Sequence, residues 1–335
     1  MGKAYLYICS TSYHLYITLL KQFELCRKNV DLVICDDIVE GKKITARIKS
    51  LNLFRNVWFV EQSLLPDWVA KNRFERIFFQ HRKRRKLIKP YIPFKIYTYR
   101  HIYIFHDDIA LGRYLVDSYK RYHLIEDSYN FFQRLYETPQ VRCLRTQSRY
   151  YKIARLLNIG YFPLGHSILL KDVEVNENKH LQIPCKKIVE TPRKLLRERL
   201  TPKDLQTLSY IFDYEHSLDI DNVALILTEP LYLEQKCNTQ DEQLSIYKYV
   251  CEHFMTKGCN VLLKPHPRDQ IDYSSLDVII LKQCVPIELM FDLGVKDINC
   301  LFSISSSTSF SLPAKHKYTI NNQEIVEITI NPIAT

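Results

Sequence analysis

The sequence is poor in glycine, with 7 residues in 335. Neither glycine-rich loop that holds phosphate, G-x-G-x-x-G or G-x-x-x-x-G-K-[ST], occurs in it. A dinucleotide-binding enzyme or a P-loop NTPase is therefore not expected. Long apolar runs are missing too: no stretch of about 18 apolar residues exists, so the sequence predicts no transmembrane helix.

Paired cysteines are also missing, because the ten cysteines are scattered and form no C-x-x-C motif. Most lie in apolar stretches, which is typical of buried free thiols in a reducing compartment. A zinc site needs clustered Cys and His ligands, and the sequence shows none. The apolar first twenty residues contain Ser, Thr and His but no small-residue cleavage site, so they indicate a strand and a helix, not a signal peptide. These features predict a cytoplasmic protein.

Basic residues are in excess, with 47 Lys and Arg against 37 Asp and Glu, which gives a net charge of +10. This balance favours anionic partners: nucleic acid, phospholipid head groups, or phosphorylated and acidic small molecules. Part of the charge lies in the run Arg82–Lys86, on a predicted helix. One interpretation is a solvated helix face, and another is attraction to the anionic inner face of a membrane. No RNP-like or helix-turn-helix motif is present, so nucleic acid is not an expected partner.

Short apolar strands alternate with amphipathic helices in two parts of the chain. Strands are predicted at residues 5–9, 30–35, 57–60, 102–105, 122–125, 224–227, 261–263, 278–281 and 301–304. Helices are predicted after residue 12, with Ser12 as the N-cap, at 242–256, and from Pro286. Such alternation is typical of βαβ units and a mostly parallel sheet.

The predicted fold class is therefore α/β, with two Rossmann-like domains that face a central cleft. We expect an N-terminal domain at residues 1–150 and a C-terminal domain at 216–335. The region between them, 151–215, is rich in Lys, Arg, Leu and Glu and predicts helices and connections. Since ligands of such sheets bind beyond the carboxyl ends of the strands, functional residues should directly follow strands.

The segment Lys264-Pro-His-Pro-Arg268 follows the strand predicted at 261–263. Proline restricts its own backbone and that of the residue before it, so His266 is held between two constraints. A held imidazole suits catalysis, and the flanking cations favour an anionic ligand. A solvated surface turn is the alternative interpretation.

Hydroxyl groups follow the strand predicted at 301–304, in the run Ser305, Ser306, Ser307 and Thr308. Hydroxyls together with backbone N–H groups at the start of a helix bind phosphate without glycine. A polar turn or a helix cap is the alternative.

Carboxylates follow other strands. Glu126 and Asp127 come after the strand at 122–125, and Glu229, followed by Glu234, comes after the strand at 224–227. Each is a candidate general base, and a helix cap or a polar loop is the alternative. Glu288 lies in the first turn of the helix predicted at Pro286, where it would complement the helix dipole or bind ribose hydroxyls.

The order of these segments resembles the bacterial sialyltransferases that modify lipooligosaccharide and capsule, in particular the lipooligosaccharide sialyltransferase family. Families of this kind share an HP motif, a serine motif and an acidic D/E-D/E-G motif, in whose last position this chain has Ser128. The matching segments are His266-Pro267, Ser305–Ser307, Glu126–Ser128, Ile8–Leu15 and Phe105–Gly112.

The resemblance implies a GT-B fold, CMP-sialic acid as the donor, inversion at the anomeric carbon, and no metal or bound cofactor. It implies that His266 acts on the leaving phosphate, that the serines hold this phosphate, and that Glu288 contacts the ribose. The base is either in the acidic motif or at Glu229 or Glu234. Asp107-Asp108 leaves a metal site as a minor alternative.

The expected function is transfer of sialic acid to a galactoside of a lipooligosaccharide or capsule, near the inner membrane face. The alternatives are a transferase for another CMP-activated keto-sugar or another polysaccharide glycosyltransferase, and a non-enzymatic module that binds nucleic acid or a membrane surface. The oligomeric state stays open, with a homodimer among the options.

Overall fold

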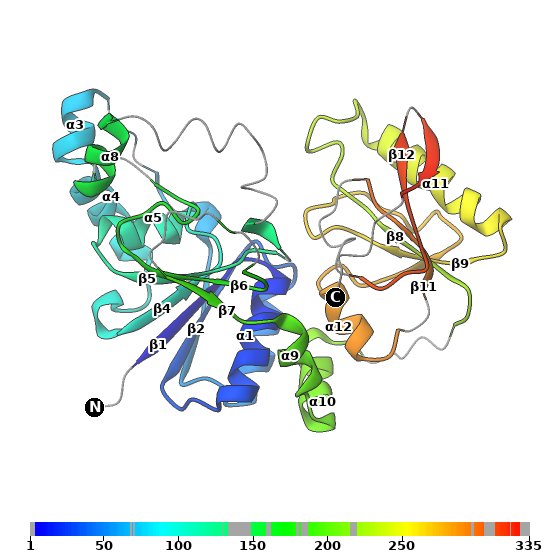
Figure 1. The fold of residues 1–335 in the computed structure, drawn as a ribbon, viewed down its shortest axis with the longest axis horizontal. Helices are drawn as coiled ribbons and strands as arrows, with labels where there is room; N and C mark the ends of the chain where they lie inside the picture. Colours follow the sequence, from blue (N-terminus) through cyan, green and yellow to red (C-terminus); the bar gives the residue numbers. More distant parts are fainter. Residues whose placement is uncertain are drawn as a thin grey trace. The chain divides into compact units, whose positions relative to one another are not determined.

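The structure is a computed structural model of the chain (Figure 1). It describes residues 4–67, 69, 71–128, 130–132, 149–158, 162–178, 181, 187–214, 220–295, 298–304, 312–321 and 323–328. The chain forms two compact units, Met1–Thr201 and Pro202–Thr335. Each unit has its own sheet and its own hydrophobic core.

The sheet of the first unit has seven parallel strands within the described residues, in the order β3-β2-β1-β4-β5-β6-β7. The strands are β1 (Tyr5–Cys9), β2 (Val30–Cys35), β3 (Asn56–Val60), β4 (His101–Ile104), β5 (Tyr122–Ile125), β6 (Leu170–Val175) and β7 (Ile188–Glu190). Continuous apolar runs form the central strands because these strands are covered on both faces. Every residue of β2 is buried, for example.

The described helices of this unit are α1 (Ser12–Leu25), α2 (Gly41–Ser50), α3 (Arg73–Phe78), α4 (Gln80–Ile88), α5 (Ala110–Asp117), α8 (Arg149–Leu156) and α9 (Arg193–Glu198), with 3-10 turns η1 (Gln62–Leu64), η2 (Lys89–Tyr91) and η3 (Ile96–Thr98). The N-cap of α1 is Thr11, one residue before the predicted Ser12. Its hydroxyl accepts the backbone N–H of His14 at 3.1 Å, which satisfies a donor of the first turn.

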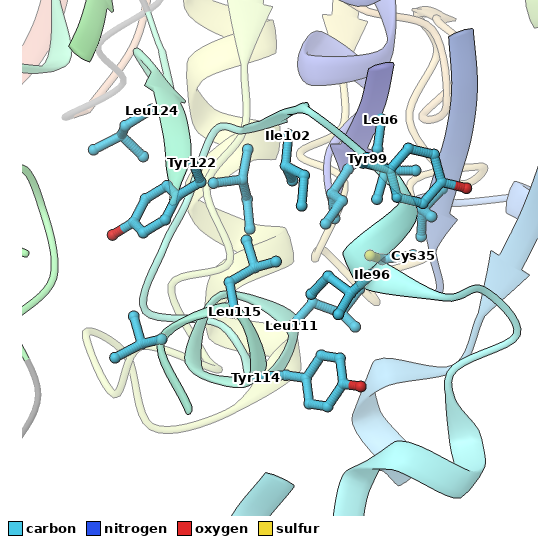
Figure 2. Packing of buried hydrophobic residues seen from close by; sticks show 14 of the residues in the cluster. Leu6, Cys35, Ile96, Tyr99, Ile102, Leu111, Tyr114, Leu115, Tyr122 and Leu124 are labelled. Carbon is cyan, nitrogen blue, oxygen red and sulfur yellow. The ribbon is translucent and has the colours of Figure 1, made fainter. Parts of the chain in front are cut away.

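Helices α1 and α5 cover opposite faces of the first sheet. Leu6 on β1 belongs to the hydrophobic cluster that includes Leu111 and Leu115 of α5, and Figure 2 shows these side chains together. Cys9 points to the other face, where its Sγ lies 3.3 Å from the hydroxyl of Thr18 on α1. The alternation of side chains along a strand therefore gives each helix one face of the sheet.

Strands β6 and β7 lie in the region 151–215, where the sequence predicts helices and connections. Their apolar pattern is interrupted because β6 buries a charge: Glu174 forms ion pairs with Lys21 of α1 and, at 2.7 Å, with Arg193 of α9. A carboxylate normally indicates an exposed position, so the sequence pattern does not show this strand.

The sheet of the second unit has six strands within the described residues, in the order β10-β9-β8-β11-β12-β13. The strands are β8 (Val223–Leu227), β9 (Asn260–Lys264), β10 (Ile279–Ile280), β11 (Ile298–Phe302), β12 (His316–Asn321) and β13 (Glu324–Glu327), and the helices are α10 (Pro202–Phe212), α11 (Gln240–Thr256) and α12 (Ile287–Asp292). All strand pairs are parallel except β12 with β13. The predicted α/β class with two Rossmann-like units is confirmed. How the units face one another stays a prediction.

The core of the second unit forms where α11 lies on the sheet. Tyr247, Val250 and Phe254 of this helix pack in one cluster with Ile226 of β8 and Leu263 of β9. Burial of such side chains stabilises the unit by about 1.5–3 kcal/mol for each residue. The carboxyl ends of β8 and β9 are therefore supported by a packed core.

Two further expectations concern cysteines and membrane spans. Eight of the ten cysteines are described; all eight are free and all except Cys26 are buried, as the sequence predicted for that part of the chain. None of the described helices combines the length and the apolar character that crossing a bilayer requires.

Candidate active site

Two of the predicted segments meet at the carboxyl edge of the second sheet. Strands β8 and β9 are parallel neighbours, with Leu227 opposite Lys264. The backbone N–H of Thr228, the first residue after β8, donates to the carbonyl of Lys264 at 3.1 Å. The turn that carries Glu229 and the turn that carries His266 therefore leave the sheet side by side.

The predicted serine run follows β11, the other neighbour of β8. Phe302 of β11 lies opposite Ile226 of β8, so the chain leaves β11 at the same edge. The four residues of the run, Ser305, Ser306, Ser307 and Thr308, lie outside the described residues, and their role stays a prediction.

His266 is held by hydrogen bonds on three sides. Its backbone N–H donates to the hydroxyl of Thr228 at 2.9 Å, and its backbone carbonyl accepts from the side-chain amide of Gln283 at 2.6 Å. Its Nδ1 accepts the backbone N–H of Arg268 at 3.1 Å. Because Nδ1 is an acceptor, the ring proton of the neutral imidazole is on Nε2, which can donate to a ligand.

The charge state of His266 agrees with this tautomer. Burial, followed by the charge of Arg268, lowers the pKa of His266 below its ordinary value. The side chain is half-buried, so a neutral donor is presented in a partly dry site. A donor of this kind strengthens a bond to an anion that develops charge during a reaction.

Lys264 lies under this loop and not on its surface. Its ammonium is buried and donates to the carbonyls of Gln283 at 3.0 Å and Pro265 at 3.2 Å. Burial lowers its pKa to about 8, although Cys284 and Glu288 partly oppose this shift. Glu288, half-buried in the first turn of α12, is thus close enough to interact with this charge.

Pro267 and Arg268 complete the loop. The carbonyl of Pro267 accepts from Gln283 at 3.2 Å. Arg268 is exposed, and its guanidinium forms a 2.8 Å ion pair with Glu234, which also pairs with Lys236 at 2.9 Å. The hydrogen bond from Lys236, with smaller contributions from Arg268, lowers the pKa of Glu234. Glu234 is thus engaged with two cations.

Glu229 is buried in the neighbouring turn. Its backbone N–H donates to the hydroxyl of Tyr247 at 2.6 Å, and its carbonyl accepts from Gln243 at 3.1 Å. Its carboxylate lies 3.5 Å from the ammonium of Lys236. The backbone of this acid is therefore anchored to α11, as a positioned base requires.

A buried carboxylate that the sequence analysis did not select links the two turns. Asp269 accepts from Thr228 at 2.7 Å, from Tyr273 at 2.7 Å and from Gln243 at 3.0 Å. Thr228 holds the N–H of His266, and Gln243 holds the carbonyl of Glu229. The sequence does place this acid directly after the HP segment, but its hydrogen-bond partners cannot be predicted from the sequence pattern.

In the first unit the two predicted acids have different environments. Glu126 is 2% exposed, and its carboxylate accepts the backbone N–H groups of Asn176 at 2.8 Å and Phe132 at 3.1 Å. The side chain of Asp127 is 25% exposed and lies 2.8 Å from Nε2 of His14. Of this pair, Asp127 is the acid that solvent reaches.

Asp107, which the sequence left open as a metal ligand, has hydrogen-bond partners inside the fold. Asp107 is buried and accepts from the hydroxyl of Tyr122 at 2.6 Å and from the N–H of Leu164 at 2.7 Å. Within the described ranges, no group of three or more His, Cys, Asp or Glu side chains is arranged to hold a metal ion.

Comparison with known proteins identifies the family of the chain. A solved structure, the spinosyn forosaminyltransferase SpnP, aligns over 93% of this chain and 77% of its own, with a TM-score of 0.40 and 11% identity. An uncharacterized protein of Haemophilus influenzae is 27% identical over 108 residues, which span 30% of this chain and about a third, 34%, of that protein. The model of glycosyltransferase family 52 matches residues 49–326, from the end of α2 into β13. With most of its length matched, the chain belongs to glycosyltransferase family 52.

Proposed function

We propose that the protein is an inverting, metal-independent sialyltransferase that moves sialic acid from CMP-sialic acid to a galactoside of a bacterial lipooligosaccharide or capsule. Membership of glycosyltransferase family 52 supports glycosyl transfer. The observation that carries the proposal is the imidazole of His266, whose Nδ1 is occupied by the N–H of Arg268 and whose Nε2–H is a donor at the carboxyl edge of the sheet.

On the donor side, the bond between the anomeric carbon and the phosphate oxygen breaks, and its electron pair stays on CMP. We propose that His266 donates a hydrogen bond to that phosphate through Nε2–H. Ser305, Ser306, Ser307 and Thr308 are the proposed phosphate ligands, and Glu288 is the proposed ribose ligand. Since negative charge grows on the phosphate as the bond breaks, donors fixed in advance bind the transition state more tightly than the substrate.

On the acceptor side, the oxygen of a galactose hydroxyl forms the new bond and its proton must be removed. We propose Glu229 as the base, because Asp269 and Gln243 tie its turn to the turn of His266. Asp127 is the second candidate. Glu126 is less suited, since its carboxylate holds two backbone N–H groups inside the first unit.

Incubation with CMP-sialic acid and lactose tests the function. A sialylated trisaccharide and free CMP should form, with unchanged yield when EDTA is present. A parallel reaction with CMP-Kdo as donor tests the other keto-sugar, and turnover of that donor alone would replace the proposed substrate. Absence of any product from both donors would contradict the function.

We also propose that the protein contacts the anionic inner membrane face through α3 and α4. Phe74 and Phe78 are 61% and 64% exposed, and their ring centroids are 4.8 Å apart. Exposed Lys83 and Lys86 follow on α4. Aromatic and basic side chains on one short helical segment are typical of elements that lie in a membrane interface. Arg84 of the same basic run is buried against Asp117, so it is not part of this surface.

A further inference from the structure

Four basic side chains lie together at the amino edge of the first sheet, the edge opposite to the one that carries Asp127. Strands β4, β5 and β6 are consecutive parallel neighbours in this sheet (Figure 1). Arg100 directly precedes β4, Lys120 and Arg121 directly precede β5, and Lys171 is the second residue of β6. The proposed donor chemistry and the proposed membrane surface use none of these four cations, so the basic edge requires its own explanation.

A hydrogen bond across three strands holds the basic edge together. The ammonium of Lys171 donates to the backbone carbonyl of Arg100 at 2.7 Å, although β5 separates the strands of these two residues. The first residue of β5, Tyr122, pairs with Leu170, so β5 and β6 begin at the same level. The side chain of Lys171 therefore reaches across the amino end of β5, where the other two cations lie.

The four cations have no acidic partner within the described residues, where no ion pair joins any of them to an Asp or a Glu. Asp172 follows Lys171 in the sequence but is engaged by an imidazole, since its carboxylate lies 2.7 Å from Nδ1 of His123. Nε2 of His123 in turn lies 3.0 Å from Nδ1 of His101. Like charges that are close together repel one another, and an anion bound among them would remove this repulsion.

The electrostatic environment of Lys171 shows this repulsion. Burial lowers the pKa of Lys171 most, and the charges of Arg121, Lys120 and Arg100 lower it further, whereas Asp172 opposes them. Burial also lowers the pKa of Lys120. Both ammonium groups are half-buried, and both guanidinium groups are exposed. The basic edge therefore combines two accessible cations with two that are partly removed from water.

The end of a helix explains only one member of the basic edge. Helix α5 ends at Asp117, and the backbone N–H of Lys120 donates to the carbonyl of Leu115 at 2.9 Å. Carbonyl groups at the end of a helix favour a nearby cation, but this effect falls off within the last turn. It accounts for Lys120 and not for the cations at β4 and β6.

The chemistry of these side chains suits a phosphate group. A guanidinium presents N–H groups in a planar fork that matches two phosphate oxygens, and an ammonium is a compact charge with three donors. A half-buried ammonium attracts an anion more strongly than an exposed one, because water screens the interaction less. Four cations at one edge match a ligand with at least two negative charges.

We propose that the amino edge of the first sheet binds a terminal phosphate group, as in a phosphate monoester or a diphosphate, between Arg100, Lys120, Arg121 and Lys171. The ligand is a soluble phosphorylated molecule or the head group of a phosphorylated lipid, and the chemistry that they share is the terminal phosphate. The site is separate from the donor site of the second unit, and it does not depend on the proposed function.

Calorimetric titration of the full-length protein with pyrophosphate tests the site. The triple variant Lys120→Gln, Arg121→Gln and Lys171→Gln should bind pyrophosphate about tenfold or more weakly, because charged hydrogen bonds are lost. Unchanged affinity in this variant would place the bound pyrophosphate elsewhere in the protein and would overturn the site. If the triple variant does not fold, Arg100→Gln combined with Arg121→Gln decides, since both side chains are exposed.

A matched control separates the site from a general effect of charge. Lys42→Gln, Lys43→Gln and Lys49→Gln remove the same charge from exposed positions of α2, which packs on β2 and β3 on the far side of β1 from the basic edge. This control should change the affinity by less than about twofold, because exposed charges at such a distance are screened by salt. Equal weakening in both triple variants would overturn the site.

Flotation with phosphatidylcholine vesicles that contain phosphatidic acid distinguishes the two sources of the phosphate, because the head group of phosphatidic acid is a phosphate monoester. Flotation that falls in the triple variant of the basic edge, and not in the α2 control, would identify a lipid ligand. Pyrophosphate binding without such a fall would identify a soluble ligand. A natural protein that binds neither pyrophosphate nor these vesicles would overturn the site, whether or not the protein transfers sialic acid.

Discussion

The imidazole of His266 is the residue on which the proposed donor chemistry depends. We predict that His266→Asn lowers kcat about 100-fold or more, since a donor to the developing phosphate charge is lost. CMP affinity should change much less, because this bond is stronger in the transition state than in the ground state. Stopped assays for kcat and calorimetry for CMP binding measure the two effects. Near-normal turnover would remove His266 from the mechanism.

Lys264 makes stability depend on pH in the alkaline range. Its pKa is about 8 in the folded protein against an ordinary value of 10.5, so the unfolded chain binds more protons between these values. The free energy of unfolding should therefore rise as the pH increases from about 8 to about 10.5, as the buried ammonium becomes neutral. Below pH 8 Lys264 is protonated in both the folded and the unfolded chain, so its contribution to the free energy of unfolding does not change with pH.

Urea unfolding across this range, compared with Lys264→Met, measures this contribution. The difference in unfolding free energy between the two proteins should change with pH over this window and be constant below it. A constant difference across the whole range would show that the ammonium is not buried as described.

At the scale of the elements, Asp269 couples the turn after β8 to the turn after β9. We predict that Asp269→Ala lowers the free energy of unfolding by about 3 kcal/mol or more, because buried donors of Thr228, Tyr273 and Gln243 lose their acceptor. It should also lower kcat, since both turns shift. Urea unfolding and the transfer assay measure the two losses.

The matched control for that variant is Asp272→Ala, because Asp272 is exposed and accepts a local backbone N–H from Ser274, two residues further along the chain. Its effect on stability should stay within about 0.5 kcal/mol. Equal losses of unfolding free energy in both variants would contradict the role of Asp269, because its hydrogen bonds would then contribute no more than those of an exposed acid.

The sequence predicts the elements whose apolar runs are continuous. Strands β1, β2, β5, β8 and β9 lie where those runs predict them, within one or two residues. It does not predict β6, whose Glu174 is buried by cations from α1 and α9, or the half-exposed pair β12 and β13. These strands were not predicted because the ion pairs that bury Glu174 and the pairing of edge strands depend on residues that are far away in the sequence.

The same limit applies to the site. Proline spacing and strand ends were sufficient to select His266 and Glu229. The residues that hold them, Thr228, Gln243 and Asp269, are ordinary polar residues in the sequence. The register of β8 against β9 brings the turns of Thr228 and Asp269 together, and the packing of α11 on the sheet brings Gln243 to them. The environment of Asp127 depends in the same way on His14, 113 positions earlier in the chain.

At the scale of the whole molecule, the net charge of +10 has an expected consequence for location. We predict that the protein floats with anionic phosphatidylglycerol vesicles and not with neutral phosphatidylcholine vesicles, because each basic residue near an anionic surface contributes about 1 kcal/mol. Phe74→Ser combined with Phe78→Ser should reduce flotation, while the exposed aromatic control Tyr249→Ser on α11 should not. Equal flotation with both lipids would contradict an electrostatic membrane surface.

Calorimetric titration of the natural protein with CMP, UMP, UDP and GDP tests the central claim most directly, because it asks which nucleotide the edge beyond β8, β9 and β11 is built to bind. The proposed function predicts saturable binding of CMP, with the other three nucleotides about tenfold weaker or more. Tighter binding of UDP or GDP than of CMP, or no binding of CMP at all, would contradict it.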